Sequence, residues 1–202
     1  VNGLHGPPLK IPRCWFRDHE CDTVCSLQGF CDASKDAYAA VIYLRLASAS
    51  GVSIRFVASK TRVAPIKGQT IPRLELLGAL LLVKLMSNVM QALEPEVNLS
   101  EPSCFTDSKV VLFWIQGRKE WKQFVQNRVN EIRELLPVGV WKHCCGADNP
   151  HVPSRGVSVV ELTCNPVWLK GPIWLSESQG MIPDMDQEEP PEECLKEMKC
   201  KG

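Results

Sequence analysis

The first patterned part of the chain holds three segments that are rich in apolar, β-branched and aromatic residues. A short apolar run ends at 29–32, and two longer segments, Ala37–Leu46 and Val52–Val63, flank an Ala-Ser-Ala-Ser-Gly turn. Residues of these types favour the pleated, half-buried surface of a sheet, and the turn is short enough to join neighbouring strands. The pattern predicts three consecutive strands arranged as a meander.

Helical patterns follow the three strands. Pro72–Leu93 is apolar on most of its circumference, begins two residues after Thr70 and ends before Pro95, so it predicts a capped helix that lies covered on a sheet. The remaining elements are a strand, two helices and a last strand, over Ser103–Thr106, Ser108–Gln116, Phe124–Leu136 and Val138–Cys145. The order predicts an α/β fold with a mixed five-stranded sheet and helices on both faces. Three of its strands are antiparallel, and two are joined by helical crossovers.

Composition agrees with one globular domain and places its boundaries. The chain has 202 residues, of which 45% are hydrophobic and 23% charged, which suits a packed core and argues against general disorder. Its longest uninterrupted apolar stretch, Leu76–Val83, is too short to span a bilayer, so we expect no membrane anchor. We expect a connector at 1–26, a domain at 27–175 and an acidic, flexible tail at 176–202.

The start of the chain, its cysteines and its charges give further expectations. The chain begins at Val1 without the apolar region of a signal peptide, which is typical of a piece of a longer protein. Ten cysteines without an export signal favour reduced thiols and an intracellular location. Basic and acidic residues balance at 23 each, but residues 184–202 hold seven acids against three lysines, which leaves the rest of the chain basic.

Three acids stand where a carboxylate is costly to bury, namely Asp32, Glu75 and Asp107. Asp32 and Asp107 each end a predicted strand, and Glu75 lies in the apolar helix, so one crevice at a topological switch of the sheet could collect all three. Clustered carboxylates attract hard divalent cations such as Mg²⁺ or Mn²⁺, and a two-ion site of this kind hydrolyses phosphodiesters. Each acid also has a possible local role, as a turn residue, a helix-dipole partner or a helix cap.

Basic side chains are gathered in two places. The first group, on the third strand and the loop that follows it, comprises Arg55, Lys60, Arg62, Lys67 and Arg73. The second comprises Arg118, Lys119, Lys122 and Arg128, interleaved with Trp114, Trp121 and Phe124. Contacts with nucleic-acid phosphates and stacking on bases are one interpretation, and a solvated loop face and core aromatics are the other. For nucleic-acid binding the residues we single out are Lys60, Arg62, Arg73, Lys109 and Arg128.

Two smaller groups are weaker candidates. The set Cys14, His19, Cys21 and Cys25 could suggest zinc, but it lacks a Cys-x-x-Cys half, and incidental thiols in a connector are the simpler interpretation. His143 ends the last strand, where packing is the simplest role and proton transfer in the crevice is the alternative.

Several short motifs in order along the chain resemble those of one family. They are Phe30-Cys31-Asp32-Ala33-Ser34, Ser59-Lys60-Thr61-Arg62, Ile71-Pro72-Arg73-Leu74-Glu75-Leu76, Thr106-Asp107-Ser108, Asn127-Arg128-Val129, Gly146-Ala147-Asp148-Asn149-Pro150, Ser154-Arg155-Gly156 and Gly171-Pro172. This series, over about 27–175, resembles the ribonuclease H domain of Pao/BEL-type LTR retrotransposon polyproteins. Because it spans many motifs in the right order, it is more specific than any one of them.

The resemblance implies a ribonuclease H-like fold and a metal-dependent endonuclease. It implies that Asp32, Glu75 and Asp107 hold two Mg²⁺ or Mn²⁺ ions, with Asp32 between them, and that the RNA strand of an RNA:DNA hybrid is cut. It also implies a reverse transcriptase and an integrase region in the same polyprotein, no membrane partner, and a place in cytoplasmic virus-like particles or the nucleus.

The sequence departs from the family pattern at the fourth acid. The family has Ala-Asp after Asn-Pro, whereas this chain has His151 there and is one residue shorter before Ser154. A neutral imidazole is a poor ligand for Mg²⁺, so we expect a weakened second ion and weakened cleavage, with better activity in Mn²⁺. The alternative is a catalytically inactive nucleic-acid-binding or interaction module. A polynucleotidyl transferase of the same superfamily fits less well, because the acids here follow the order Asp, Glu, Asp.

Overall fold

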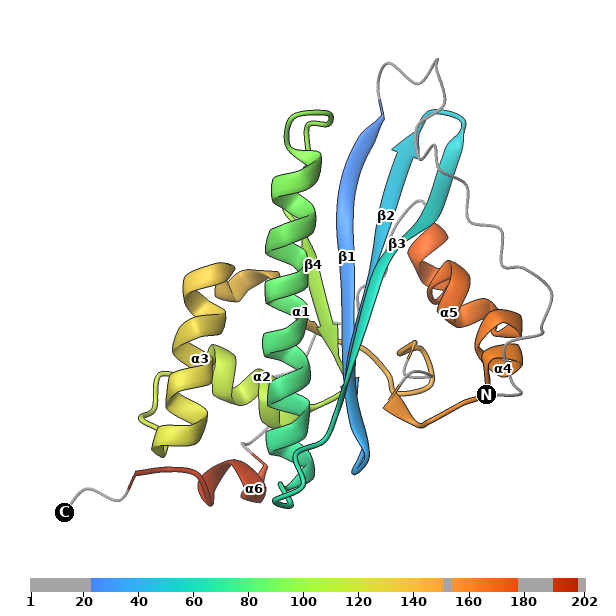
Figure 1. Ribbon diagram of the computed structural model, residues 1–202. Helices are drawn as coiled ribbons and strands as arrows, with labels where there is room; N and C mark the ends of the chain where they lie inside the picture. Colours follow the sequence, from blue (N-terminus) through green and yellow to red (C-terminus); the bar gives the residue numbers. More distant parts are fainter. Residues whose placement is uncertain (1–22, 151–153, 178–190, 200–202) are drawn as a thin grey trace.

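A five-stranded sheet forms the centre of the protein. The computed structural model describes residues 23–150, 154–177 and 191–199. In the order in which they lie side by side, the strands are β3 (Gly51–Val63), β2 (Ala37–Ser48), β1 (Val24–Ala33), β4 (Ser103–Thr106) and β5 (Trp141–His143). Figure 1 shows the long strands β1 to β3 beside the shorter β4.

Strand directions match the predicted arrangement. Strand β2 pairs antiparallel with both β1 and β3, and Ser48 and Gly51 close the hairpin between β2 and β3. Strand β4 lies parallel to β1, and β5 lies parallel to β4, because each of these connections passes through helices. The direction of pairing therefore reverses at β1, which has an antiparallel neighbour on one side and a parallel neighbour on the other. The mixed sheet with two helical crossovers is confirmed.

Helix α1 (Ile71–Leu93) covers one face of the sheet, together with α2 (Lys109–Gln116) and α3 (Gln123–Leu135). By length and composition α1 could cross a membrane, but its apolar side chains pack in the main core, where Leu76, Leu82 and Met86 are fully buried. The core of this face also takes Cys31 and Ile42 from the strands. Helix α1 is the core helix that the pattern predicted.

Short helices cover the opposite face. They are α4 (Val159–Cys164), α5 (Pro166–Lys170) and the 3₁₀ helix η3 (Ile173–Ser176), and Figure 1 shows α4 and α5 on the side of the sheet away from α1. Here Phe30 stacks on Phe105 with ring centroids 4.8 Å apart, and the Tyr43 hydroxyl donates to the Trp168 carbonyl at 2.6 Å. Phe30 and Cys31 thus face opposite layers, as expected for a strand buried on both sides.

Three local expectations differ from the structure. Strand β1 starts at Val24, inside the expected connector, because Cys25 and Leu27 are buried and belong to the core. The last strand covers only Trp141–His143 and is preceded by the 3₁₀ helix η1 (Val138–Val140). The described part of the expected tail, 191–199, is packed against the domain rather than solvated, since Cys194 on α6 (Glu192–Leu195) is fully buried. The boundaries of the domain stay a prediction.

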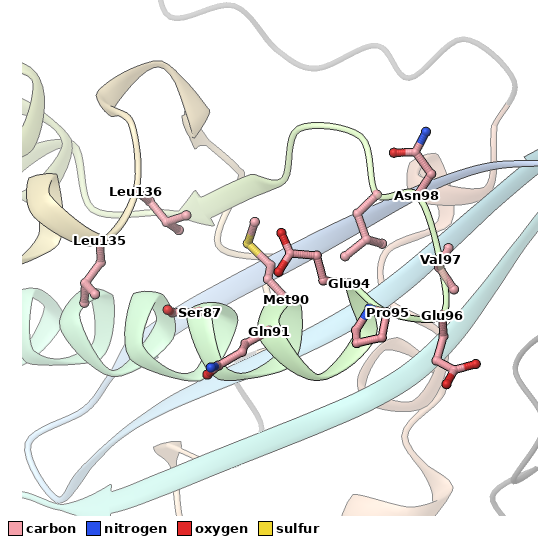
Figure 2. A pocket seen from close by; sticks show the side chains of 11 residues that line it. Ser87, Met90, Gln91, Glu94, Pro95, Glu96, Val97, Asn98, Leu135 and Leu136 are labelled. Atoms are coloured by element: carbon pink, nitrogen blue, oxygen red, sulfur yellow. The ribbon is translucent and has the colours of Figure 1, made fainter.

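A groove of about 640 Å³ lies at the far end of α1 from Glu75. Figure 2 shows Met90, Glu94 and Pro95 at the end of α1, with Leu135 and Leu136 beside them and the segment 96–98 on the other side. The groove is therefore separate from the acidic residues singled out in the sequence.

Candidate active site

The ends of two neighbouring parallel strands bring Asp32 and Asp107 to one edge of the sheet. Phe30 of β1 pairs with Phe105 of β4, and each aspartate lies two residues further along its chain. Because the two strands run in the same direction, residues the same distance beyond this pair lie at the same end of the sheet, and so do the two aspartates. Asp32 is 7% exposed, so its carboxyl group is largely shielded from water.

Glu75 of α1 completes the group of acids. Its pKa is raised to about 7, mainly because burial penalises the charged form. A hydrogen bond from Ser108 opposes this shift, while the nearby carboxylates of Asp107 and Asp32 raise the pKa further. The two strand-end aspartates therefore lie within electrostatic reach of Glu75, and the three acids form one negatively charged site.

Serines take the local roles that the sequence left open for these acids. The N-cap of α2 is Ser108, whose Oγ accepts from the Val111 amide, and not Asp107. In the turn after β1, the hydroxyl of Ser34 accepts from the Asp36 amide. Glu75 lies beyond the first turn of α1, which holds no acid. Serines therefore make the cap of α2 and a turn bond after β1, and Glu75 is not among the first-turn residues of α1.

Two serine hydroxyls are bonded directly to the acids. Ser108 Oγ donates to Glu75 Oε2 at 2.6 Å, and Ser154 Oγ donates to Asp32 Oδ2 at 2.6 Å. Ser154 is fully buried and reaches Asp32 from a segment more than a hundred residues away in sequence. Sequence reasoning singled out neither serine as a site residue, although both belong to motifs that carry the family resemblance.

The loop after β5 closes against Asp107. A Cβ atom on Gly146 would lie 3.1 Å from Asp107 Oδ2, closer than side-chain packing normally allows, so glycine lets the loop approach this carboxylate. Burial raises the pKa of Cys144 in the same region, and the carboxylates of Asp107, Asp148 and Asp32 raise it further. Asp148 thus belongs to the negative environment of the site.

The donor atoms suit a hard divalent cation in their chemistry. All three acids offer carboxylate oxygens, and a positive charge would favour the charged form of Glu75, which burial in the first place and the neighbouring carboxylates to a lesser degree disfavour. As the side chains stand, no group of three or more His, Cys, Asp or Glu residues within 23–150, 154–177 and 191–199 is arranged to hold a metal ion. The acids therefore have suitable donor atoms, and their side chains would have to move for all three to share an ion.

The basic residues singled out for nucleic-acid binding lie on three surfaces. Lys60 and Arg62 are exposed on β3 and, with Lys84 of α1, line a groove of about 280 Å³. Lys109 is exposed as the first residue of α2, next to the acidic site. Arg73 lies two residues before Glu75 on α1. Arg73 and Lys109 therefore lie two residues from Glu75 and Asp107 along the chain, and Lys60 and Arg62 lie on the edge strand of the sheet.

Phe124 of α3 lies between two of the arginines. The guanidinium of Arg128 is 3.6 Å from the centroid of its ring, and that of Arg73 is 4.8 Å from the centroid. Trp114 and Trp121 are almost fully buried in the main core, so the interpretation of these tryptophans as base-stacking groups is wrong. They fill the space between α2 and α3.

The remaining candidates are only partly within the described residues. Cys25 is buried in β1 as a core residue, which does not suit a zinc ligand, while Cys14, His19 and Cys21 lie outside the described residues. His151 also lies outside them. His143 pairs with Thr106, the residue before Asp107, so its side chain could serve packing or the site, and its role stays a prediction.

Comparison with known families agrees with this arrangement. The sequence model of the Pao retrotransposon-like RNaseH-like domain matches residues 1–108, more than half of the chain. The chain belongs to this family. The matched stretch contains Asp32, Glu75 and Asp107, whereas Lys109, Arg128 and His151 follow it. A comparison with curated proteins gave no match.

Solved structures give distant likenesses to this Pao-type domain, and several of them are RNase H proteins. The N-terminal RNase H domain of Rv2228c from Mycobacterium tuberculosis is 16% identical and aligns over 64% of this chain and 87% of its own, with a TM-score of 0.42. RNase H1 from the archaeon Halobacterium salinarum is 15% identical over 60% of this chain and 87% of its own, with a TM-score of 0.39. LC11-RNase H1, solved in complex with an RNA/DNA hybrid, is 13% identical over 62% and 88%, with a TM-score of 0.38. These superpositions are loose, and the RNase H-like fold of the Pao-type domain rests on its strand order and family.

Proposed function

We propose that this Pao-type domain is a metal-dependent endonuclease that cuts the RNA strand of RNA:DNA hybrids. The observation that supports this most directly is geometric: Asp32 and Asp107 follow paired positions of β1 and β4, and Ser108, the residue after Asp107, is bonded to Glu75. Three acids from separate elements therefore lie near one another at the carboxyl ends of these strands. Such a site suits the cations and phosphates of phosphodiester hydrolysis.

The side chains have separate tasks in this proposal. Asp32, Glu75 and Asp107 would hold the ions, which when bound activate the attacking water and stabilise the leaving oxygen. Ser108 and Ser154 orient the carboxylates of Glu75 and Asp32 through hydrogen bonds of 2.6 Å. Gly146 keeps the following loop close to Asp107, which shields the site from bulk water.

Basic residues would bind the nucleic-acid backbone without reading its sequence. Lys109 and Arg73 are placed to contact phosphates next to the acids, and Lys60 and Arg62 to contact them further along the sheet edge. Lysine and arginine supply the sequence-independent, salt-sensitive part of nucleic-acid affinity. We therefore expect binding that falls with rising salt and depends weakly on sequence.

The test is cleavage of a hybrid labelled on its RNA strand, with Mg²⁺ or Mn²⁺ supplied. Asp32→Asn should abolish cleavage, because it removes a charged ligand while it preserves the shape of the side chain. The matched control is Asp36→Asn, an exposed aspartate in the turn after β1, which should cleave like the unaltered protein. Equal cleavage by the Asp32 variant and the unaltered protein would rule out this site.

A second candidate function is a nucleic-acid-binding module without catalysis. It is favoured by the serine bonds to Asp32 and Glu75, and by the absence, within the described residues, of a ready-made group of three metal ligands. His151 at the position of the family's fourth acid points the same way. Hybrid binding without cleavage in either metal would select this function.

The context of the domain is proposed from its family. We expect reverse transcriptase and integrase regions in the same polyprotein, and an intracellular location in virus-like particles or the nucleus. Sequencing of the coding region on both sides tests the first expectation directly.

A further inference from the structure

The C-terminal segment, residues 191–199, folds back across the end of the molecule that holds the acids. The thiol of Cys194 donates to the Val110 carbonyl at 3.7 Å, which fixes α6 against α2. Met198 forms an isolated bridge with Trp121, and the Lys122 amide donates to the Glu197 carbonyl at 2.7 Å. Figure 1 shows α6 beside the start of α1 and below α2.

Glu197 of this segment makes a two-pronged ion pair with Arg73. Arg73 Nε donates to Glu197 Oε1 at 2.8 Å, and the terminal nitrogen Nη2 donates to Oε2 at 3.0 Å. This fork geometry is the one that arginine uses for both carboxylates and phosphates. The side chain of Glu197 is 12% exposed and that of Arg73 is 28% exposed, so the pair is partly withdrawn from water.

Arg73 belongs to a small basic cluster rather than to an isolated ion pair. The guanidinium groups of Arg73 and Arg128 both lie over the ring of Phe124. Burial, together with the nearby charge of Arg73, lowers the pKa of Arg128. Two guanidinium groups held on one ring favour an anion beside them. Glu197 supplies that anion in the present structure.

The cluster is adjacent to the acidic site. Arg73 and Glu75 lie two residues apart near the start of α1, on different sides of the helix, and the C-terminal segment that holds Glu197 also places the Glu193 carboxylate among the charges that act on Glu75. A nucleic acid whose scissile phosphate reached Glu75 would bring neighbouring phosphates toward Arg73. The C-terminal segment covers that approach.

We propose that Arg73, with Arg128 and Phe124, forms a binding site for a backbone phosphate of the nucleic acid, and that Glu197 occupies this site as an intramolecular competitor. The inference rests on the proposed function and adds its regulation by the chain's own C-terminal segment. A hybrid must displace Glu197 to bind fully, so the segment weakens nucleic-acid binding when it is docked.

The contacts of the segment suit reversible release. Its helix α6 has four residues and one buried side chain, Cys194, and the rest of its attachment consists of a few hydrogen bonds, the partly buried Met198 and two ion pairs, Arg73–Glu197 and Lys199–Glu120. A nucleic acid offers several phosphates in place of one carboxylate, so it can compete successfully for the arginines.

The first test compares hybrid binding by Glu197→Gln and Glu192→Gln in the full chain. Binding of a fluorescent RNA:DNA hybrid is measured in EDTA, so that cleavage does not interfere. Both variants remove one negative charge from the same segment, but only the first breaks the ion pair with Arg73. Glu197→Gln should bind about fivefold to tenfold more tightly, and Glu192→Gln should stay within about twofold of the unaltered protein.

A second arm places Arg73→Gln in the Glu197→Gln background. If the freed arginine binds phosphate, this change should abolish the gain in affinity. A persistent gain would mean that general charge or loosening of the segment, rather than the Arg73 site, produced it, and it would overturn the inference.

Reactivity of Cys194 gives an independent measure of release. Its side chain is fully buried under the docked segment, so mass-spectrometric mapping of alkylation should show slow modification in the free protein and faster modification when hybrid is added. Alkylation of Cys104, buried in the central strand β4, serves as the control for general unfolding.

The outcomes separate the two proposals. Equal affinity of the unaltered protein and Glu197→Gln, with Cys194 still protected when hybrid is bound, would overturn the competitor role and leave the nuclease proposal intact. Failure of every variant to bind hybrid would overturn both.

Discussion

Gly78 of α1 lies directly against the backbone of Asp32. A Cβ atom on Gly78 would stand 3.2 Å from the Asp32 carbonyl oxygen and 3.8 Å from that of Ala39. Backbone oxygens paired in a sheet cannot rotate away as a flexible side chain can. The missing side chain therefore allows α1 to approach β1 at the level where Glu75, about one turn earlier, meets the acids of the strand ends.

Gly78→Ala should lower both stability and hybrid cleavage. Alanine improves helix propensity by about 1 kcal/mol, but overpacking against an immobile backbone costs about 1–3 kcal/mol, so the net effect is destabilising. We expect a lower melting temperature and a larger loss of cleavage than the stability loss alone explains, since Glu75 moves from Asp32. Gly139→Ala is the control, because its Cβ would meet nothing within 4 Å. Unchanged cleavage in a correctly folded Gly78→Ala would show that this close approach does not position Glu75.

The raised pKa of Glu75 should make the stability of the protein depend on pH. Its pKa of about 7 in the folded protein lies above the ordinary glutamate value, so the folded state binds the additional proton. The stability contributed by this proton is fully present below the unfolded-state pKa and is lost as pH rises through about 7. Without metal, Glu75→Gln should therefore gain in melting temperature relative to the unaltered protein as pH rises from 5 to 8.

Thermal unfolding in EDTA across this pH range measures the difference. Glu134→Gln, an exposed change on α3, should show a difference that does not vary with pH in this way. A constant offset between Glu75→Gln and the unaltered protein would contradict the raised pKa.

The order of strands shows why part of the site can be predicted from sequence alone. Asp32 and Asp107 each follow a short buried strand, and once those strands are placed as parallel neighbours their ends must coincide. Glu75 is similarly exceptional, because an acid within an apolar helix needs a polar partner. These expectations follow from the pattern of apolar and polar residues, which is visible over short stretches of the sequence.

Contacts made by loops and by the C-terminal segment could not be predicted in the same way. Ser154 reaches Asp32, and Glu197 reaches Arg73, across more than a hundred residues with no periodic pattern to indicate either contact. The charge-rich composition of 184–202 predicted a solvated end, but the buried Cys194 anchors its described part. A buried side chain and a few polar contacts, the Arg73–Glu197 ion pair among them, decided the position of a segment whose average composition suggested otherwise.

Ser108→Ala should separate the two roles of this serine. Loss of the N-cap bond to Val111 should cost about 1 kcal/mol of stability, and loss of the bond to Glu75 should raise the pKa of that carboxyl further, because this bond lowers it. The pH at which Glu75 titrates should therefore move upward, as measured by comparison with the Ser108→Ala/Glu75→Gln double variant. Ser108→Thr, which keeps the hydroxyl, should retain both properties. A loss of stability without movement of the titration would assign Ser108 to capping alone.

The rates of hybrid cleavage in Mg²⁺ and in Mn²⁺ should differ if the fourth acid is missing. The sequence resemblance aligns His151 with an aspartate of the family pattern, and a neutral imidazole supplies neither charge nor the oxygen that Mg²⁺ prefers, whereas Mn²⁺ accepts nitrogen more readily. We expect hybrid cleavage to be weak in Mg²⁺ and at least about tenfold faster in Mn²⁺, in line with the effect of weakened ligation. His151→Asp should raise the Mg²⁺ rate and narrow the difference between metals, while His151→Asn, which offers an oxygen without charge, should restore less. Equal and rapid cleavage in both metals by the unaltered protein would show that Asp32, Glu75 and Asp107 suffice without a charged fourth ligand.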